Sequence, residues 1–487
     1  MEQSESIKTL ADAALARQRA ELRLKKLLQD PIIKTNAANS DSIVISLPAG
    51  KKPGMKRVLL GGSMNPLNKG DQARIKATIQ KLYENDDISL AILSHYYEID
   101  RLVYSGDAVE IVKAPWSDNG IKLVKMASIA LFTLLRYFLL ALARRILRLR
   151  IKAKLFSYDA LVIASGIDYS DYVGRLPIYY AFFLTTLFGI IMGKPVMCYA
   201  QSMGPVENRT LSRMTRFFLN RMKTISVRDE SSLAFLRELK VNRPAIYSTA
   251  DPAFLLELSS GNPGCTLLRY GIRNIDRPLI GVSLSPAPFA APENGYCTMG
   301  LWYRINRAEA ERLSAKYIKK MARICDRLVT NYRVTLVFIP NCTARGDDDR
   351  ECMKKVHAQM IFQDRAINIT GDFSLSESME IIGACDLFLG TRLHAGIIAA
   401  VTGVPLVPLV GTDGPRVPGI MRMLGLEDYI HNIMTDGENE IIAAVNEVWN
   451  LREPMKIMMR MRIREVRKKA LENISVFREF CFRNGGP

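Results

Sequence analysis

An arginine and a histidine two residues apart form the pair in this chain best suited to chemistry. The apolar run from Asp386 to Leu389 leads into Gly390-Thr391-Arg392-Leu393-His394-Ala395. In a β/α unit this is the carboxyl end of a strand, where open α/β sheets hold ligands. Arg392 is a permanent planar donor suited to phosphate or carboxylate, and His394 can exchange a proton near neutral pH. The pair predicts anion binding coupled to proton transfer, and a structural role in a helix cap is the alternative.

A glycine-rich loop near residue 65 joins the first expected strand to its helix. It runs Gly61-Gly62-Ser63-Met64-Asn65-Pro66-Leu67-Asn68-Lys69-Gly70-Asp71. Glycines let backbone amides approach a ligand, and the following helix N-terminus adds positive potential. The sequence is neither a Walker A nor a G-x-G-x-x-G motif, so it does not indicate a nucleotide. Asn68, Gly70 and Asp71 are candidates for binding an acceptor, although Asp71 could equally be the N-cap of the helix.

Other strand ends supply further polar residues. Ser226-Val227-Arg228-Asp229 places an arginine before a helix, with Asp229 as a cap and Arg228 expected to face the cleft; a surface salt bridge is its alternative. Ser165, Asp168 and Ser202 follow equivalent strands and are expected to line the same crevice. The segment from Thr249 to Phe254 is interpreted as a turn that fixes the domain edge.

Composition limits the class of protein. The 487 residues are too many for one hydrophobic core. The eight cysteines show no CxxC pair, so neither a metal site nor a disulfide framework is predicted. The N-terminus lacks the apolar core of a secretory signal. Together these two features favour a cytoplasmic protein. The formal charge of +18 favours anionic partners. The sequence contains no recognition motif for nucleic acid, so the expected anionic partner is a phosphorylated substrate or an anionic lipid. The sequence says nothing of oligomeric state.

Short apolar runs alternate with amphipathic helices in two series, which predicts an α/β protein with mostly parallel sheets. The first series has expected strands at 57–60, 89–94, 160–164, 196–200 and 224–227, and the second at 279–284, 334–339, 367–370, 387–390 and 406–410. Two Gly/Pro patterns recur at an offset of 210 residues, which suggests two similar layers facing across a cleft. The expected organisation is an N-terminal helix and linker at 1–55, a first Rossmann-like domain at 56–260 with a helical insertion at 121–155, a second at 275–435, and a C-terminal helical segment at 436–487.

Two apolar segments raise the question of a membrane. The segment 126–143 contains Arg136 and is followed by six basic residues within 144–154. It is shorter than the ~20 apolar residues of a spanning helix, so contact with the inner membrane surface and packing within the first domain are the leading alternatives. The segment 176–192 lies between two strands and is expected to be a buried crossover helix.

The order and spacing of these motifs resemble the polysaccharide pyruvyl transferase family over about residues 56–430. The resemblance is carried by Asn68-x-Gly70-Asp71, Gly193-Lys194-Pro195, Gly204-Pro205, Val227-Arg228-Asp229-x-x-Ser232, Asp251-Pro252-Ala253-Phe254 and Arg392-Leu393-His394-Ala395. It implies a GT-B-like fold of two Rossmann-type domains, and transfer of pyruvate from phosphoenolpyruvate to hydroxyls of a cell-surface or exopolysaccharide glycan. The chain departs from the family where Ala164-Ser165-Gly166 replaces a triple glycine, and where a lysine after the last strand is missing.

On this resemblance, the site residues fall into three groups. Arg228, Arg392 and His394 are the catalytic candidates, with Leu393 and Arg416 added for the donor; Arg416 is the candidate for the missing cation. The acceptor, a glycan or lipid-linked sugar, is assigned to Asn68, Gly70, Asp71, Ser165, Asp168 and Ser202. Phosphoenolpyruvate is a substrate here, and no cofactor or metal is expected. The alternatives are a GT-B glycosyltransferase using a nucleotide sugar and a non-catalytic scaffold that binds membranes or polyanions.

Overall fold

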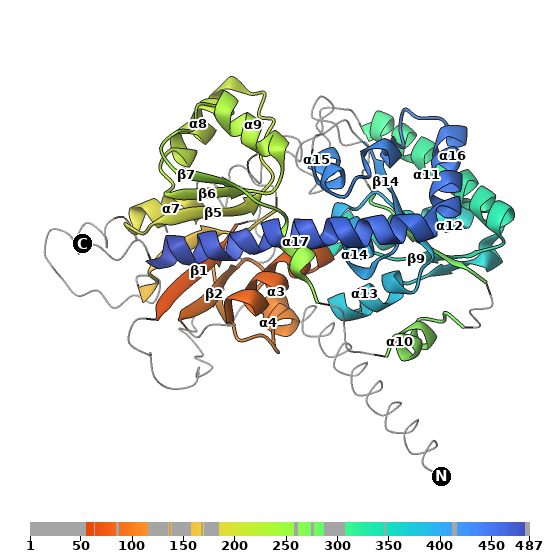
Figure 1. Cartoon of the computed structure of the whole chain (residues 1–487), viewed down its shortest axis with the longest axis horizontal. Coiled ribbons are helices and arrows are strands. Elements are labelled where there is room, and N and C mark those ends of the chain that lie inside the picture. The colour runs from red at the N-terminus through yellow and green to blue at the C-terminus, as the bar shows by residue number, and fades with distance from the viewer. Residues whose placement is uncertain are drawn as a thin grey trace, which may run out of the picture. The chain divides into compact units, whose positions relative to one another are not determined.

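Two parallel β-sheets organise the chain in the computed structural model (Figure 1). The structure describes residues 55–62, 64–83, 87–114, 135, 138, 157–166, 169, 185–257, 262–273, 277–286, 307–344, 347–411 and 416–482. The expected N-terminal helix and linker, most of the segment 126–154, much of the segment 176–192 and Asp168 lie outside these residues. Within the described ranges, no helix combines the length and apolar character that a membrane span requires.

The first sheet has seven parallel strands in the order β3-β2-β1-β4-β5-β6-β7. Their bounds are β1 Lys56–Gly61, β2 Ile88–Ser94, β3 Glu110–Lys113, β4 Ala160–Ile163, β5 Val196–Gln201, β6 Thr224–Val227 and β7 Ala245–Ser248. The order reverses direction beside β1, where β4 adds on its other side. Ligands of open α/β sheets bind at such a switch point, outside the carboxyl ends of the strands.

The second sheet has six parallel strands in the order β12-β9-β8-β13-β14-β15. Their bounds are β8 Leu279–Ser283, β9 Thr335–Phe338, β12 Ala366–Asn368, β13 Leu387–Gly390, β14 Leu406–Val410 and β15 His431–Asn432. A short antiparallel hairpin, β10 (Thr343–Ala344) with β11 (Asp347–Asp348), follows β9. The helix α14 (Leu393–Thr402) follows β13, so the Arg-Leu-His motif lies at a strand-to-helix turn as the sequence predicts.

Helices connect the strands of both sheets. In the first half they are α3 (Lys69–Tyr83), α4 (Tyr97–Val103), α7 (Leu187–Ile191), α8 (Arg209–Leu219), α9 (Glu230–Glu238), η5 (Pro252–Leu255) and α10 (Pro263–Arg269). In the second half they are α11 (Arg307–Tyr332), α12 (Asp349–Gln359), η6 (Gln363–Arg365), α13 (Leu375–Gly383), α14, α15 (Arg416–Met423), η7 (Glu427–Tyr429), α16 (Glu438–Asn450) and α17 (Arg452–Phe482). Most of them bury one apolar stripe against a sheet, as amphipathic helices of α/β proteins do.

The last helix, α17, returns from the second half of the chain to the first sheet (Figure 1). Asn473 is fully buried, and its amide donates to the carbonyl of Ala250 at 2.7 Å. Its carbonyl oxygen accepts hydrogen bonds from Thr249 and Ser226 at 2.7 and 3.1 Å. Because every polar group of this amide is satisfied, burial of Asn473 is tolerated and the segment 249–251 is fixed against β6.

The expected strands are confirmed within two residues at each end. The structure adds strands that were not predicted, among them the edge strands β3, β7 and β15. Edge strands bury only part of their side chains, and every residue of β7 is exposed or intermediate, so they lack the apolar run that marks a central strand. The C-terminal helical segment expected at 436–487 contains two helices that separate at Leu451, and α10 lies between the two expected domains.

Candidate active site

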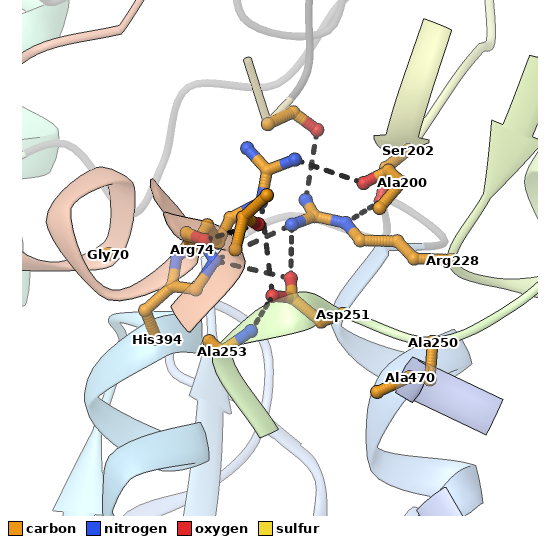
Figure 2. Close-up of polar contacts among 12 residues, drawn as sticks. Gly70, Arg74, Ala200, Ser202, Arg228, Ala250, Asp251, Ala253, His394 and Ala470 are labelled. Atoms are coloured by element: carbon orange, nitrogen blue, oxygen red, sulfur yellow. Dashed lines mark hydrogen bonds and ion pairs between the residues drawn. The ribbon is translucent and has the colours of Figure 1, made fainter. Parts of the chain in front are cut away.

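Asp251 is the centre of a buried polar cluster between the ends of β6, α3, η5 and α14 (Figure 2). Its side chain is fully buried and caps η5 by accepting the backbone N–H of Ala253 at 2.9 Å. The other carboxylate oxygen contacts the guanidinium of Arg228 and lies 3.3 Å from Nε2 of His394. Burial alone would raise the pKa of Asp251, but the charges of Arg228 and His394 lower it below its ordinary value. Asp251 is therefore a carboxylate that holds two candidate catalytic residues together.

Arg228 follows β6 and is completely buried. All three of its nitrogens are engaged: Nε donates to Ser202 at 2.8 Å, Nη2 donates to the carbonyl of Gly166 at 3.0 Å, and Nη1 pairs with Asp251. Ser202 in turn donates to Asp229 at 2.7 Å, and Asp229 is the N-cap of α9 as predicted. The prediction that Arg228 is free to face the cleft is wrong, because all its nitrogens have protein partners. The alternative of a surface salt bridge is also wrong, because the pair with Asp251 is fully buried.

His394 lies in the first turn of α14 and reaches the residues of the first sheet. Its Nε2 is 3.5 Å from Nη1 of Arg228. Gly70 makes this approach possible, because a Cβ at that position would lie 2.3 Å from Nδ1 of His394. Burial lowers the pKa of His394 below its ordinary value; Asp251 opposes this effect, and the charge of Arg228 reinforces it. The imidazole therefore gives up its proton more readily than a free histidine does, and it lies beside a carboxylate able to stabilise its protonated form.

Two further side chains of α3 complete the cluster. Arg74 is buried, donates to the carbonyl of Ala200 at 3.1 Å and lies 3.8 Å from Asp251. Asp71 accepts the backbone N–H of Asn65 at 3.0 Å. The helix begins at Lys69, so Asp71 belongs to its first turn and the N-cap alternative for this residue is wrong. Burial raises the pKa of Asp71, and the Asn65 N–H and Arg74 oppose that rise.

Arg392 is the N-cap residue of α14 and is held by two carboxylates of unequal burial. Asp349 is fully buried, accepts from Nη2 of Arg392 at 2.5 Å, and also accepts the backbone N–H groups of Asn341 and Cys342. Asp347, on the hairpin strand β11, is 24% exposed and accepts from the same nitrogen at 2.7 Å. Asp349 is thus anchored to the backbone, whereas the more exposed Asp347 is the partner that an incoming anion could replace.

The remaining predicted residues are distributed around this cluster. Asn68 accepts the N–H of Gly70 at 2.8 Å and the amide of Asn341 at 3.3 Å, so it fastens α3 to the loop after β9. Ser165 accepts from Gln201 at 3.1 Å, and Leu393 is buried in the apolar core. Arg416 begins α15, a helix whose Gly419 packs against Asp229. Asp168 lies outside the described residues.

Sequence reasoning gave no site role to Asp251, Arg74, Asp347 or Asp349, although Asp251 belongs to one of the motifs that carry the family resemblance. Arg74 had a usable signal, since it lies within a run whose neighbours Ala73, Ile75 and Ala77 are all apolar, and an arginine inside such a face needs a buried partner. The three consecutive aspartates at 347–349 follow a predicted strand. Asp251 gave a weaker signal, because an Asp-Pro pair is a common turn.

Comparisons with known proteins agree with the fold. A UDP-GlcNAc 2-epimerase from Neisseria meningitidis, solved with UDP-GlcNAc, superposes with a TM-score of 0.52 at 11% identity, covering 88% of this chain and 100% of that one. The UDP-GlcNAc 2-epimerase from Methanocaldococcus jannaschii gives 0.52 at 12% identity, covering 81% and 93%. The chain therefore has a GT-B-like fold, in which two Rossmann-type domains carry parallel sheets.

Sequence comparisons reach further than the fold. The model of the family "Polysaccharide pyruvyl transferase" matches residues 68–413, a span that includes the cluster described above. The amylovoran biosynthesis protein AmsJ from Erwinia amylovora is 25% identical over 300 residues, which is 61% of this chain. The match spans 66% of AmsJ, slightly less than two thirds of that protein. The chain belongs to the polysaccharide pyruvyl transferase family, a family of transferases.

Proposed function

We propose that this chain transfers pyruvate from phosphoenolpyruvate to hydroxyl groups of a sugar in a cell-surface or exopolysaccharide glycan, with release of phosphate. The observation that carries the proposal is the meeting of His394, from the second domain, with Arg228 and Asp251 from the first. Cations and a proton-transfer group in one buried place suit a donor that carries both a phosphate and a carboxylate. Family membership and the relation to an amylovoran biosynthesis protein support a glycan as the acceptor.

The reaction assigns a proton movement to His394. A sugar hydroxyl adds to C2 of the donor and passes its proton to the imidazole of His394, and the imidazolium delivers that proton to C3 as the double bond is lost. The bond between C2 and the phosphate oxygen then breaks, a second hydroxyl closes the ketal at C2, and its proton leaves with the phosphate. Asp251, 3.3 Å from Nε2, stabilises the imidazolium that forms in the first step. The lowered pKa of His394 favours the unprotonated imidazole, so we assign deprotonation of the acceptor as its first role.

The donor anion is assigned to Arg392. Its planar guanidinium can grip a phosphate or carboxylate with two hydrogen bonds, and exchange of Asp347 for the donor would leave Asp349 in place. Arg228, already saturated by protein groups, contributes its positive charge 3.5 Å from His394, and Arg416 is a further donor cation. The acceptor is assigned to the N-terminal turn of α3, where Gly70 and Asp71 adjoin His394.

The surroundings of the enzyme are part of the same proposal. We infer a cytoplasmic protein, in which the donor and a lipid-linked sugar acceptor would meet at the inner membrane surface. The seven cysteines within the described ranges form no disulfide, and six of them are buried, which suits a reducing compartment.

The test is an assay of the purified chain with separate donors. Phosphoenolpyruvate should give phosphate release that depends on a glycan acceptor, with a mass gain on the glycan equal to a pyruvate ketal. UDP-sugars, tested in parallel with assay of nucleotide release, address the glycosyltransferase alternative that the fold also allows. Nucleotide release in place of phosphate release would replace the proposal by that alternative. If neither donor is turned over with any glycan of a broad panel, the non-catalytic scaffold becomes the favoured alternative.

A further inference from the structure

One exposed helix face of the first domain carries arginines, and the exposed Glu207 lies just before the helix. Residues 208–223 contain five basic residues and no acidic one. On α8, the buried stripe is Leu211, Thr215, Phe218 and Leu219, which pack toward the domain. The opposite stripe is Arg209, Arg213 and Arg216, and all three are exposed. These spacings of four and three residues place the arginines on one side of the helix, where their charges add.

The positive surface continues past the end of the helix. Arg221 and Lys223 are exposed, as are Lys240 and Arg243 before β7. Asn220 joins the two groups, because its side chain accepts the backbone N–H groups of Asn242 and Arg243 at 3.1 Å and donates to the carbonyl of Lys240 at 3.5 Å. We call these seven cations, Arg209, Arg213, Arg216, Arg221, Lys223, Lys240 and Arg243, the α8 patch.

An aromatic side chain lies among these cations. Phe217 is 50% exposed although it is large and apolar. The guanidinium of Arg221 stacks over its ring at 3.3 Å from the centroid and donates to its carbonyl oxygen at 3.0 Å. An exposed ring surrounded by arginines is the composition found on proteins that lie at a membrane interface, where the ring enters the headgroup layer and the cations meet phosphates.

The position of the α8 patch leaves the catalytic cluster uncovered. Lys223 immediately precedes β6, and Lys240 and Arg243 precede β7, so this part of the patch is at the amino ends of those strands. Arg228 follows β6 at its carboxyl end, and a four-residue strand separates the two ends by about 13 Å. A planar partner on the patch would leave the carboxyl edge accessible to substrates.

We propose that the α8 patch docks the protein on a membrane surface rich in anionic phospholipid. Charge complementarity selects this partner, because the same charges on a second copy of the chain would repel. Single-stranded nucleic acid is disfavoured because its binding surfaces stack successive bases on several aromatic rings, whereas Phe217 is the one aromatic among the exposed side chains of α8. The inference goes beyond the proposed reaction, and it holds for any activity of the site.

Vesicle sedimentation of the full chain tests the proposal. Wild type should sediment with phosphatidylcholine vesicles containing phosphatidylglycerol at low salt, and should remain in solution at high salt or with phosphatidylcholine alone. Changing Arg209, Arg213 and Arg216 together to Gln should weaken binding about 100-fold, from the usual contribution of each cation near a charged surface. Phe217→Ser should weaken binding without removing its salt dependence.

A matched variant controls for the loss of three charges. Arg312, Arg323 and Arg327 on α11 changed to Gln should bind vesicles like wild type, and circular dichroism should show that both triple variants are folded. Equal binding by wild type and the α8 triple variant would overturn the proposal, and so would tighter binding to a DNA oligonucleotide than to the vesicles. Loss of binding only when the basic residues of 144–154 are changed would assign docking to that segment instead. Vesicle binding needs no donor, so its failure is distinct from failure of the transferase assay.

Discussion

Replacing Asp251 with Asn should destabilise the fold far more than a typical loss of an ion pair. The variant keeps the volume and an oxygen that can accept from Ala253, but it removes the charge that neutralises two buried arginines, Arg228 and Arg74. Deleting one partner of a buried pair costs about 3–5 kcal/mol, because the remaining charge stays desolvated. The hydrogen bonds that Arg228 keeps to Ser202 and Gly166 place the expected loss near the lower end, about 3 kcal/mol.

Urea unfolding of Asp251→Asn, with Asp87→Asn as the control, measures this effect. Asp87 pairs with Arg478, but both side chains are about one-third exposed, so its loss should cost about 0–1 kcal/mol. For Asp251→Asn the urea concentration at the unfolding midpoint should fall strongly, while the dependence of the unfolding free energy on urea concentration stays unchanged. In folded enzyme the same change should move the His394 limb of the pH–rate profile to lower pH, because Asp251 favours the imidazolium. Equal midpoints for the two variants would refute the reasoning that Asp251 holds the cluster together.

Three further predictions concern the contacts around the site and one buried acid. Gly70→Ala should lower turnover about 10²-fold, since its Cβ would displace His394, whereas Gly106→Ala, with nothing within 4 Å of the added methyl, should leave turnover unchanged. Asp347→Asn should lower the KM for phosphoenolpyruvate up to about fivefold, because it removes a carboxylate that competes with the donor for Arg392. Arg392→Lys should raise the same KM. If steady-state kinetics show no change in KM for either variant, the donor does not take the place of Asp347 at Arg392. Burial raises the pKa of Asp100 from 3.8 to about 6, so its folded form retains a proton that the unfolded chain loses, and stability falls as pH rises between these values. The free energy of unfolding of Asp100→Asn should therefore exceed that of wild type by about 3 kcal/mol at pH 8 and by little at pH 4. If chemical unfolding gives the same difference at both pH values, the pKa of Asp100 is not raised by burial.

The sequence was sufficient for the architecture because the central strands of a parallel sheet are buried on both faces and form continuous apolar runs. The Arg392-Leu393-His394 motif was located for the same reason, since it directly follows such a run. Edge strands such as β7 were not predicted, because their partly exposed side chains do not form a continuous apolar run.

The interior of the site could not be derived in the same way. The pairing of Arg228 with Asp251 joins residues 23 positions apart, and that of Arg228 with His394 joins residues 166 apart, so tertiary packing decides both. From the local sequence, Asp71 could be a helix N-cap and Asp251 could be part of a turn, and nothing in the local sequence marked either residue as the centre of the site. The structure makes Asp251 a cap that is also the central carboxylate, a double role that no local pattern distinguishes.

Acceptor-dependent phosphate release from phosphoenolpyruvate, compared between wild type and His394→Ala, tests the central claim most directly. The wild-type chain should release phosphate only when a glycan acceptor is present, and the variant should remain folded with turnover lowered ~10²-fold or more, the usual scale for a positioned acid or base. Turnover of a folded His394→Ala protein near the wild-type rate would contradict the assignment of proton transfer to this residue.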